Sequence, residues 1–276
     1  MSIPLLELRA VSYAYEGQLH ALRDVSVSIF AGERIAVIGN NGAGKSTFFL
    51  CCNGVLIPQS GSVHFRGKKI HAKKRELNEL RQHVGIVFQD PDQQLIGATV
   101  EEEISFGPMN LPLREREVKT RVEEAIAQMN MSSLRERPPH YLSGGEKKRL
   151  SIADILAMGS DMILLDEPTA SLDNVNAQLL ESTLNDLHSQ GKTLVVSTHD
   201  TDFAYRWATR ILVFHDGMII HDDTSAKIFE DDGAIRQAGV RLPVVYKMAM
   251  LLKRKGMLSV NGALPRSFKE LEEYLN

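Results

Sequence analysis

The chain has 276 residues, of which 43% are hydrophobic and 24% charged, a composition typical of a globular protein with a sizeable core and unlike disordered or collagen-like chains. Its net charge of −3, from 32 basic and 35 acidic residues, gives no reason to expect a nucleic-acid partner. With only two cysteines, the sequence predicts no disulfide framework and favours a reducing cytosolic compartment. No apolar run is long enough for a membrane-spanning helix, and no basic region precedes an apolar one at the start of the sequence, so we expect neither a membrane-spanning helix nor a signal peptide.

The first part of the chain is predicted to mix antiparallel hairpins with one buried strand. Short β-like runs bounded by turn residues lie at residues 5–8, 25–29 and 62–70. Residues 34–38 are apolar without alternation, which is typical of a strand covered on both faces of its sheet. A glycine-rich loop follows, and then a helix from about Lys45 that Asn53 and Gly54 can end.

Strand and helix patterns alternate through the middle of the chain. Buried strands are predicted at residues 83–88, 162–165 and 193–197, and helices at residues 114–129, 143–158 and 174–188. Residues 99–102 fit a capping box that opens a further short helix, and Asp216-Gly217 fits a hairpin turn. The alternation indicates a parallel α/β sheet.

The pattern changes near residue 235, which divides the chain into a main domain, residues 1–235, and a small helical appendage, residues 236–276. Pro243 suits the first position of a helix that Gly256 can end. The predicted apolar face of this helix comprises Val244, Val245, Met248, Leu251 and Leu252. A second capping box, at residues 267–270, is expected to open a last helix.

The loop after residues 34–38 matches the P-loop pattern G-x-x-x-x-G-K-[ST]. Its residues are Gly39, Asn40, Asn41, Gly42, Ala43, Gly44, Lys45 and Ser46, with Thr47 next on the helix. Glycines let successive backbone N–H groups turn towards phosphate oxygens, and the following helix points its positive end at the same anion. The Lys45 ammonium can reach the β- and γ-phosphates, and the Ser46 hydroxyl can ligate Mg²⁺. A chance glycine turn is the alternative, but the position between a buried strand and a helix is the one that the motif requires.

Asp166 and Glu167 follow an apolar run and so lie at the carboxyl end of a predicted buried strand, where parallel sheets bind ligands. Asp166 is expected to hold the magnesium ion through water, and Glu167 can polarise the attacking water as a general base. Alone, such a run could be a strand that ends in solvent. Together with the P-loop it predicts a nucleotide triphosphatase.

A second phosphate-binding device lies about 100 residues after the P-loop, in the segment Leu142-Ser143-Gly144-Gly145-Glu146. Ser143 can cap the helix that begins there, and Gly144 and Gly145 expose backbone N–H groups at its positive end. With this segment, residues 3–230 resemble the ATP-binding-cassette (ABC) family. The resemblance implies a P-loop α/β cassette with a parallel core sheet, an antiparallel β subdomain, a helical subdomain that carries the Leu-Ser-Gly-Gly signature, and here a short helical C-terminal tail.

The resemblance implies further roles for individual residues. Tyr15, with Tyr13 as a substitute, is similar to the aromatic residue that stacks on adenine. Gln89 is similar to the glutamine that meets the metal and senses the membrane partner. His199 is similar to the switch histidine that contacts the γ-phosphate, and Ser171-Leu172-Asp173 matches the segment known as the D-loop.

The same resemblance implies a dimer. In this family the Leu-Ser-Gly-Gly segment caps the nucleotide held by the P-loop of a second subunit, so that two cassettes enclose two ATP molecules. The second subunit is expected to be another copy of this chain or a close paralogue. The apolar face of the helix that begins near Val244 is a candidate for holding the two subunits together between cycles.

Segments of this chain also resemble the ATPase subunits of energy-coupling-factor (ECF) and cobalt or nickel importers. They are residues 89–95, 100–107 and 144–153, with Leu242-Pro243 before the tail. Asp154 departs from that pattern, which has a small residue at this position. The resemblance implies an enzyme that hydrolyses ATP to energise uptake of cobalt or nickel ions or a vitamin. Its partners are expected to be a transmembrane coupling subunit and a substrate-binding membrane component, which place the chain peripherally at the cytoplasmic face of the membrane.

Two other functions are weighed. A cassette ATPase that acts on DNA or ribosomes would carry a long coiled coil between P-loop and signature, or a second cassette; the stretch from Lys45 to Leu142 has no sustained heptads and this chain has one cassette. An exporter ATPase is harder to distinguish from an importer ATPase, because the cassette sequence alone says little about the direction of transport. Residues 89–95 and the tail favour import.

The segment from Gln89 to Phe106 is the expected docking surface for the membrane subunit, because it links a glutamine at the metal to a polar stretch interrupted by proline. Leu95, Ile96 and Phe106 could form the floor of a groove that accepts a partner helix. The alternative is that these side chains pack under a loop. Elsewhere Cys51 and Cys52 are interpreted as packing residues, and the lysines and arginine of residues 68–75 as a solvated face.

Overall fold

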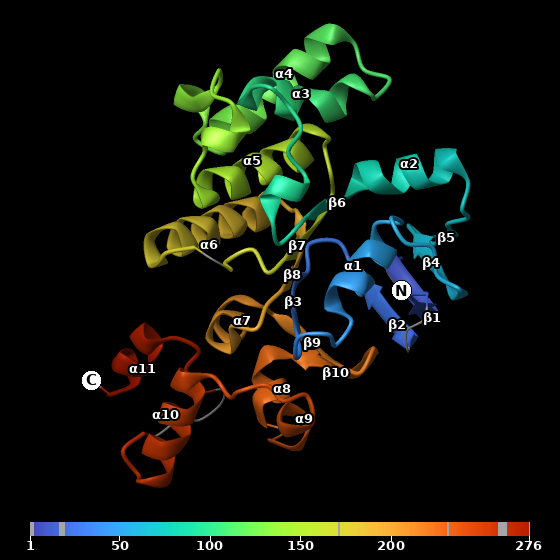
Figure 1. Ribbon diagram of the computed structural model, residues 1–276. Coiled ribbons are helices and arrows are strands. Elements are labelled where there is room, and N and C mark those ends of the chain that lie inside the picture. Colours follow the sequence, from blue (N-terminus) through green and yellow to red (C-terminus); the bar gives the residue numbers. More distant parts are fainter. Residues whose placement is uncertain (1–2, 17–19, 171, 231, 259–263, 276) are drawn as a thin grey trace.

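A six-stranded sheet forms the centre of the structure (Figure 1). The structure is a computed structural model that describes residues 3–16, 20–170, 172–230, 232–258 and 264–275. In spatial order the strands are β10 (Met218–Thr224), β9 (Arg210–His215), β3 (Arg34–Ile38), β8 (Thr193–Ser197), β7 (Met162–Asp166) and β6 (Val84–Val87). β10 is antiparallel to β9, and the remaining neighbours are parallel, as the alternating pattern predicts.

A second, antiparallel sheet lies beside it and confirms the predicted β subdomain. Its order is β2 (His20–Ile29), β1 (Leu6–Ala14), β4 (Ser60–Phe65) and β5 (Lys68–Lys69). β1 and β2 are longer than predicted, because irregularities in their register interrupt the alternation that marks a strand. Ala10 lies at one of them, with a φ of 51° and an N–H group that donates to Ser26 Oγ at 2.8 Å.

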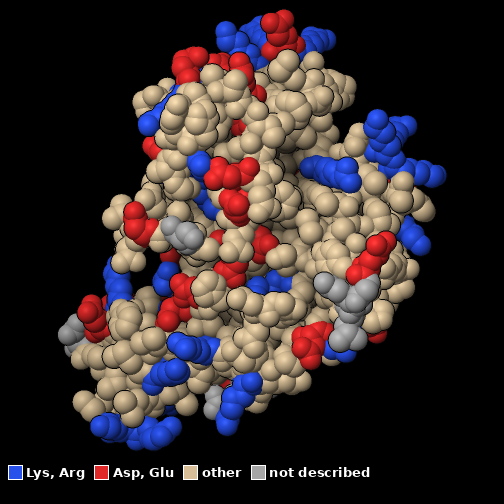
Figure 2. Space-filling view, in the orientation of Figure 1, with Lys and Arg blue, Asp and Glu red and all other residues tan. Residues whose placement is uncertain are grey.

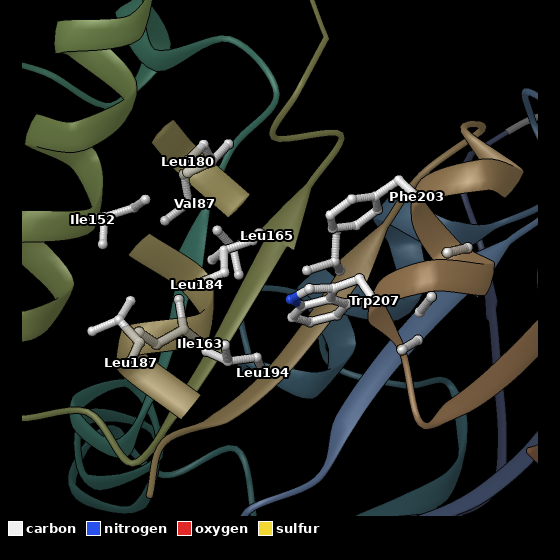
Figure 3. Close-up of a cluster of buried hydrophobic side chains, with 14 of the residues drawn as sticks. Val87, Ile152, Ile163, Leu165, Leu180, Leu184, Leu187, Leu194, Phe203 and Trp207 are labelled. Atoms are coloured by element: carbon white, nitrogen blue, oxygen red, sulfur yellow. The ribbon is translucent and has the colours of Figure 1, made fainter. Parts of the chain in front are cut away.

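The core sheet is buried on both faces because its strands serve two hydrophobic cores. In β3, Ile35 and Val37 pack towards the antiparallel sheet and α1 (Lys45–Cys52), while Ala36 and Ile38 pack towards the opposite face. On that opposite face, shown in Figure 3, the side chains of β7 and β8 meet those of α6 (Asn174–Ser189), and Phe203 stacks on Trp207. This double burial explains the apolar runs without alternation.

Helices cover both sheets. Three helices, α3 (Val100–Met109), α4 (Glu115–Gln128) and α5 (Gly144–Ala157), pack together as a helical subdomain at one end of the molecule (Figure 1).

The sequence does not predict α2 (Lys74–His83), α8 (Ser225–Glu230) or α9 (Asp232–Gln237). In α2 only Leu80 is buried, so this helix lacks the apolar periodicity by which helices are found. Figure 2 shows its basic side chains together with those of β5, all facing solvent, which fits the predicted solvated face.

The two predicted capping boxes form only in part. Thr99 Oγ1 accepts a hydrogen bond from the Glu102 N–H group at 3.2 Å, but the Glu102 carboxylate accepts from Ala98 at 3.2 Å and not from Thr99. At residues 267–270 the arrangement repeats, and the glutamate accepts from the Arg266 N–H group at 2.7 Å. In both cases the glutamate carboxylate accepts from the N–H group of the residue before the N-cap and not from that of the N-cap itself. The reciprocal hydrogen bond that defines a capping box is therefore not formed at these two helices.

The tail begins with α10 (Val244–Arg254) and ends with α11 (Phe268–Leu275). The five predicted residues do share one face of α10, because at about 100° per residue they fall within an arc of about 120°, but only one side of this face is buried. Val245 is buried and Leu252 packs against the small tail core of Ala249, Leu258 and Leu271. The second side faces solvent: Val244 is 49%, Met248 40% and Leu251 50% exposed.

The tail is anchored to α7 (Thr201–Trp207), which begins two residues after His199. The Val244 N–H group donates to Asp202 Oδ1 at 2.7 Å. Arg266 Nε donates to the Tyr205 carbonyl at 2.8 Å, and the Tyr205 ring packs edge-on against that of Tyr246. The tail is therefore tied to the segment that leaves the candidate site.

Candidate functional site

A cleft of about 1050 Å³ opens at the carboxyl end of the core sheet. Nine predicted site residues line it: Asn41, Gly42, Ala43, Gly44, Lys45, Ser46, Thr47, Asp166 and Glu167. Two further predicted site residues, Gln89 and Tyr15, line it as well, so residues from six separate stretches of the chain, counted with residues 20–23 and 216–217, meet around one space. This is the edge of a parallel sheet at which ligands bind.

The loop between β3 and α1 requires glycine at defined positions. Gly39, Gly42 and Gly44 have φ values of 154°, 80° and 104°. A Cβ atom at Gly39 would lie 2.4 Å from the Phe214 carbonyl oxygen, and one at Gly44 would lie 2.5 Å from that of Ala21. Both the backbone conformation and the close approach of neighbouring backbone therefore exclude side chains here.

Lys45 lies under this loop with 7% of its surface exposed. Its Nζ donates to the Gly39 carbonyl at 2.7 Å and to the Asn40 carbonyl at 3.2 Å. Burial lowers the pKa of the Lys45 ammonium, and the charges of Glu167 and Asp166 oppose this effect. The ammonium is thus held at the loop by the loop's own carbonyls, in reach of an anion that the N–H groups would bind.

Asp166 ends β7, Glu167 follows it directly, and both are buried. Glu167 Oε2 faces His199 Nδ1 at 2.8 Å and accepts from the His199 N–H group at 3.4 Å. The structure therefore brings together the predicted general base and the predicted switch histidine, which are 32 residues apart in sequence. Glu167 has a φ of 44°, in the left-handed region that residues with a side chain rarely adopt.

The possible metal ligands among the predicted residues also meet. Ser46, Gln89 and Asp166 line the same cleft and offer hydroxyl, amide and carboxylate oxygens. Such hard oxygen donors suit Mg²⁺, which takes few protein ligands and completes its shell with water and phosphate. The Gln89 backbone carbonyl accepts a hydrogen bond from Lys148 Nζ at 2.8 Å, and this contact anchors the start of the segment from Gln89 to Phe106 to α5.

Tyr15 lies at the rim of the cleft, 39% exposed, with its hydroxyl 3.4 Å from Thr47 Oγ1. Tyr13 packs edge-on against it but does not line the cleft. His20, Ala21, Arg23, Asp216 and Gly217 complete the lining, and the sequence does not predict that any of them belongs to the site. Arg23 Nε donates to the Asp216 carbonyl at 2.7 Å. Only the pairing of β2 with β1 and the position of the β9–β10 turn bring these residues beside Tyr15.

The remaining predicted site residues lie outside this cleft. Ser143 caps α5: its N–H group donates to Glu146 Oε2 at 2.7 Å, and its Oγ accepts from the Glu146 N–H group at 3.4 Å. Gly144 is exposed with no atom near its Cβ position, whereas Gly145 packs against Asn176 of α6.

Asp173 lies beside this signature segment and caps α6. Its Oδ1 accepts from the Asn176 N–H group at 2.8 Å, and this backbone hydrogen bond lowers the pKa of the Asp173 carboxyl. Asn176 thereby touches both Asp173 and Gly145. Ser171, in the same predicted segment, lies outside the described residues.

The two cysteines and Asp154 take no part in the cleft. Burial raises the pKa of the Cys51 thiol to about 12 and that of Cys52 well above its usual range, which fits their interpretation as packing residues. Burial also raises the pKa of the Asp154 carboxyl well above its usual range, with Glu103 adding to the effect. Asp154 thus stands where a small residue is expected, as a carboxyl group packed inside the helical subdomain.

The strand, glycine loop, helix and acidic strand end define a P-loop nucleoside-triphosphate-binding protein of the α/β class. Comparison with known proteins identifies the family within this class: the model of the ABC transporter family matches residues 22–170. The chain is 46% identical to the energy-coupling factor transporter ATP-binding protein EcfA of Methanothermobacter thermautotrophicus, over 97% of this chain and 86% of that protein. It is 43% identical to the cobalt import ATP-binding protein CbiO of Rhodobacter capsulatus, over 96% of this chain and 94% of the relative.

Among solved structures, a dimeric ATP-binding cassette, MJ0796, bound to ADP and Pi after hydrolysis, superposes with a TM-score of 0.71 at 28% identity, over 80% of this chain and 98% of that one. The chain belongs to the ABC transporter family, as a subunit that binds and hydrolyses ATP. Among the described residues, no helix is long and apolar enough to cross a bilayer.

Proposed function

We propose that this protein hydrolyses ATP on the cytoplasmic face of the membrane and thereby energises uptake through an ECF-type or cobalt-type importer. The observation that carries the proposal is the cleft lined by the P-loop, Gln89, Asp166 and Glu167, with His199 in contact with Glu167, in a chain that shares over 40% identity with ATP-binding subunits of such importers. Cobalt or nickel ions or a vitamin would be the cargo, recognised by a separate membrane component.

Each residue of the cleft has a proposed part in hydrolysis. The loop N–H groups and Lys45 bind the phosphates, and the Tyr15 ring stacks on adenine. Ser46, Gln89 and Asp166 fit Mg²⁺ in the kind of donor they offer, and the ion when bound would neutralise charge that develops on the phosphates. Glu167 takes the proton of the attacking water, and His199, in contact with Glu167 Oε2, holds that carboxylate in place and faces the γ-phosphate.

A second subunit completes the proposed site. The signature segment exposes Ser143 and Gly144 at the N-terminus of α5, but neither residue lines the cleft of its own chain. A helix N-terminus with free N–H groups is suited to a phosphate of a nucleotide bound elsewhere. Two copies of this chain, or this chain and a paralogue, would therefore enclose two nucleotides, each between one P-loop and one signature segment.

The proposed docking surface for the coupling subunit is the segment between Gln89 and α3. Ile96 is 70% and Phe106 57% exposed, whereas Leu95 packs partly against the main core. The Glu103 carboxylate accepts hydrogen bonds from the N–H groups of Ile96, at 2.7 Å, and Gly97, and so holds this loop against α3. Ile96 and Phe106, and not Leu95, are thus the apolar contacts that a partner helix would meet.

The groove at this surface has a defined chemical character. It has a volume of about 440 Å³ and is lined by Thr99, Glu101, Glu102, Ser105, Phe106, Met109 and Glu136. Three carboxylates around exposed apolar side chains suit a partner helix that carries both apolar and basic residues.

Reconstitution with the membrane subunits tests the proposal. In proteoliposomes, the wild-type protein should support ATP-dependent uptake, whereas Ile96→Asp should bind ATP normally, fail to co-purify with the coupling subunit and give no uptake. Ile57→Asp, at a 43% exposed apolar residue between α1 and β4, is the matched control and should behave as wild type. Normal assembly and uptake with Ile96→Asp would place the docking surface elsewhere, and efflux in place of uptake would contradict import.

A further inference from the structure

Ser197 ends β8 and is fully buried beside Asp166 and Glu167. The parallel register of β7 and β8 pairs it with Asp166, so its side chain stands at the point where β7 turns into Glu167. From the sequence alone we predict no role for Ser197, because it reads as the last residue of a buried strand, two residues before His199. Its position in the tertiary structure suggests one.

The Ser197 hydroxyl makes two hydrogen bonds, and their direction is determined by chemistry. Ser197 Oγ accepts from the Glu167 N–H group at 3.0 Å, since an amide can only donate. The single hydroxyl proton is therefore free for the carboxylate, and Ser197 Oγ donates it to Asp166 Oδ1 at 2.5 Å. One hydroxyl thus joins the side chain of Asp166 to the backbone of Glu167.

The Glu167 backbone needs such support. Its φ of 44° is a conformation that costs of order 1–3 kcal/mol and persists only where the surroundings impose it. Ser197 supports this backbone conformation through two acceptors, because the Glu167 N–H group donates both to Ser197 Oγ and, at 3.1 Å, to the Ser197 carbonyl. Two residues further along, His199 contacts the Glu167 carboxylate. Residues 197–199 therefore hold Glu167 at both its backbone and its side chain.

We propose that Ser197 is a positioning residue for ATP hydrolysis, which keeps Asp166 aimed at the metal-bound water shell and Glu167 aimed at the attacking water. The inference rests on the proposed roles of Asp166 and Glu167. Removing the hydroxyl leaves Asp166 Oδ1 without this donor in a buried site and leaves Glu167 N–H with one acceptor. Misplacement of a reacting group by a fraction of an ångström slows chemistry without weakening the binding of the nucleotide.

The test compares Ser197→Ala with Ser197→Thr, which keeps a hydroxyl, and with Ser160→Ala. Ser160 is also fully buried, and its Oγ donates to the Gln82 carbonyl at 2.7 Å far from the cleft, so Ser160→Ala measures the loss of a buried hydroxyl alone. For each variant we would measure kcat and KM for ATP, ATP affinity in EDTA, thermal unfolding, and Mn²⁺ binding to the complex with a non-hydrolysable ATP analogue by electron paramagnetic resonance.

Ser197→Ala should lower kcat by about 10- to 100-fold and Mn²⁺ affinity by about fivefold, with KM and ATP affinity in EDTA changed less than about threefold. Ser197→Thr should recover most of the loss, and Ser160→Ala should show none. The proposal is overturned if Ser197→Ala keeps wild-type kcat and Mn²⁺ binding, if Ser197→Thr is as slow as Ser197→Ala at equal thermal stability, or if ATP affinity in EDTA falls in parallel with kcat.

Glu167→Gln, measured alongside, separates this inference from the proposed function. If Glu167→Gln turns over normally, the general-base role of Glu167 fails, and the inference fails with it. If Glu167→Gln is inactive while Ser197→Ala is normal, only the role of Ser197 is lost.

Discussion

The two predicted phosphate-binding segments of this chain, the loop at residues 39–46 and the signature segment at residues 142–146, differ in what surrounds them. The loop is enclosed: backbone from β2 and β9 approaches its glycines, and Lys45 is buried beneath it. The signature segment satisfies its own cap through Glu146 and leaves Ser143 and Gly144 open to solvent. These surroundings fit the proposed roles, in which the loop binds the phosphates of a nucleotide in its own chain and the signature segment completes the site of a partner subunit.

The largest expected effect is on the enclosed side. Lys45→Ala should weaken ATP binding by about 100-fold or more, because it removes the buried charge that offsets phosphate. Glu167→Gln should keep ATP affinity and lower kcat by at least about 100-fold, because the amide cannot accept a proton from water. Separate measurements of nucleotide affinity and steady-state hydrolysis check both. Near-normal turnover of Glu167→Gln would contradict the general-base role.

On the open side, Ser143→Arg should block hydrolysis while the isolated chain still binds ATP with wild-type affinity. The long side chain would crowd the partner's phosphates, so the ATP-dependent dimer that we expect the Glu167→Gln variant to form should be lost, as measured by light scattering. Ser133→Arg, which adds the same charge at an exposed residue of the same subdomain, is the control. If Ser143→Arg weakens ATP binding to the monomer, the segment belongs to the chain's own cleft and the comparison fails.

A smaller effect is expected in the tail. Met248→Asp should weaken self-association of the nucleotide-free protein by about tenfold and leave ATP affinity unchanged, since Met248 belongs to the exposed apolar side of α10. Met257→Asp, at a 62% exposed residue just after α10, is the control. Sedimentation equilibrium provides the measurement. Unchanged association of the Met248 variant would show that the tail does not hold the dimer together between cycles.

The smallest effect concerns Lys148, which links α5 to the start of the docking segment. Burial lowers the pKa of the Lys148 ammonium from 10.5 to about 8. Above about pH 8 the folded protein has released this proton while the unfolded chain still holds it, so unfolding takes up a proton and stability rises with pH. Relative to Lys148→Met, the wild-type free energy of unfolding should therefore rise by on the order of 1–3 kcal/mol between pH 8 and pH 10.5. Denaturant unfolding across this range checks it, and a constant difference would contradict the assignment.

Local sequence was a good guide where one segment decides the structure. The loop, its flanking strand and helix, the signature cap at Ser143 and the hairpin turn at Asp216-Gly217 lie within a few residues of predicted positions. The charged helix α2 was not found, because its single buried residue, Leu80, leaves no periodic signal. The division of the chain at residue 235 stays a prediction, and it falls within α9.

By itself the sequence determined the chemistry of this protein: glycines where the backbone must bend around an anion, a lysine and hydroxyl beside them, and two carboxylates at the end of an apolar strand. Such requirements are local, because each concerns the conformation or charge of consecutive residues. Only the tertiary structure decided which side of α10 faces solvent, that Arg23 joins Tyr15 at the cleft, and that Ser197 lies against Asp166 and Glu167. These depend on strand register and helix packing between segments distant in sequence, which no short window of residues records.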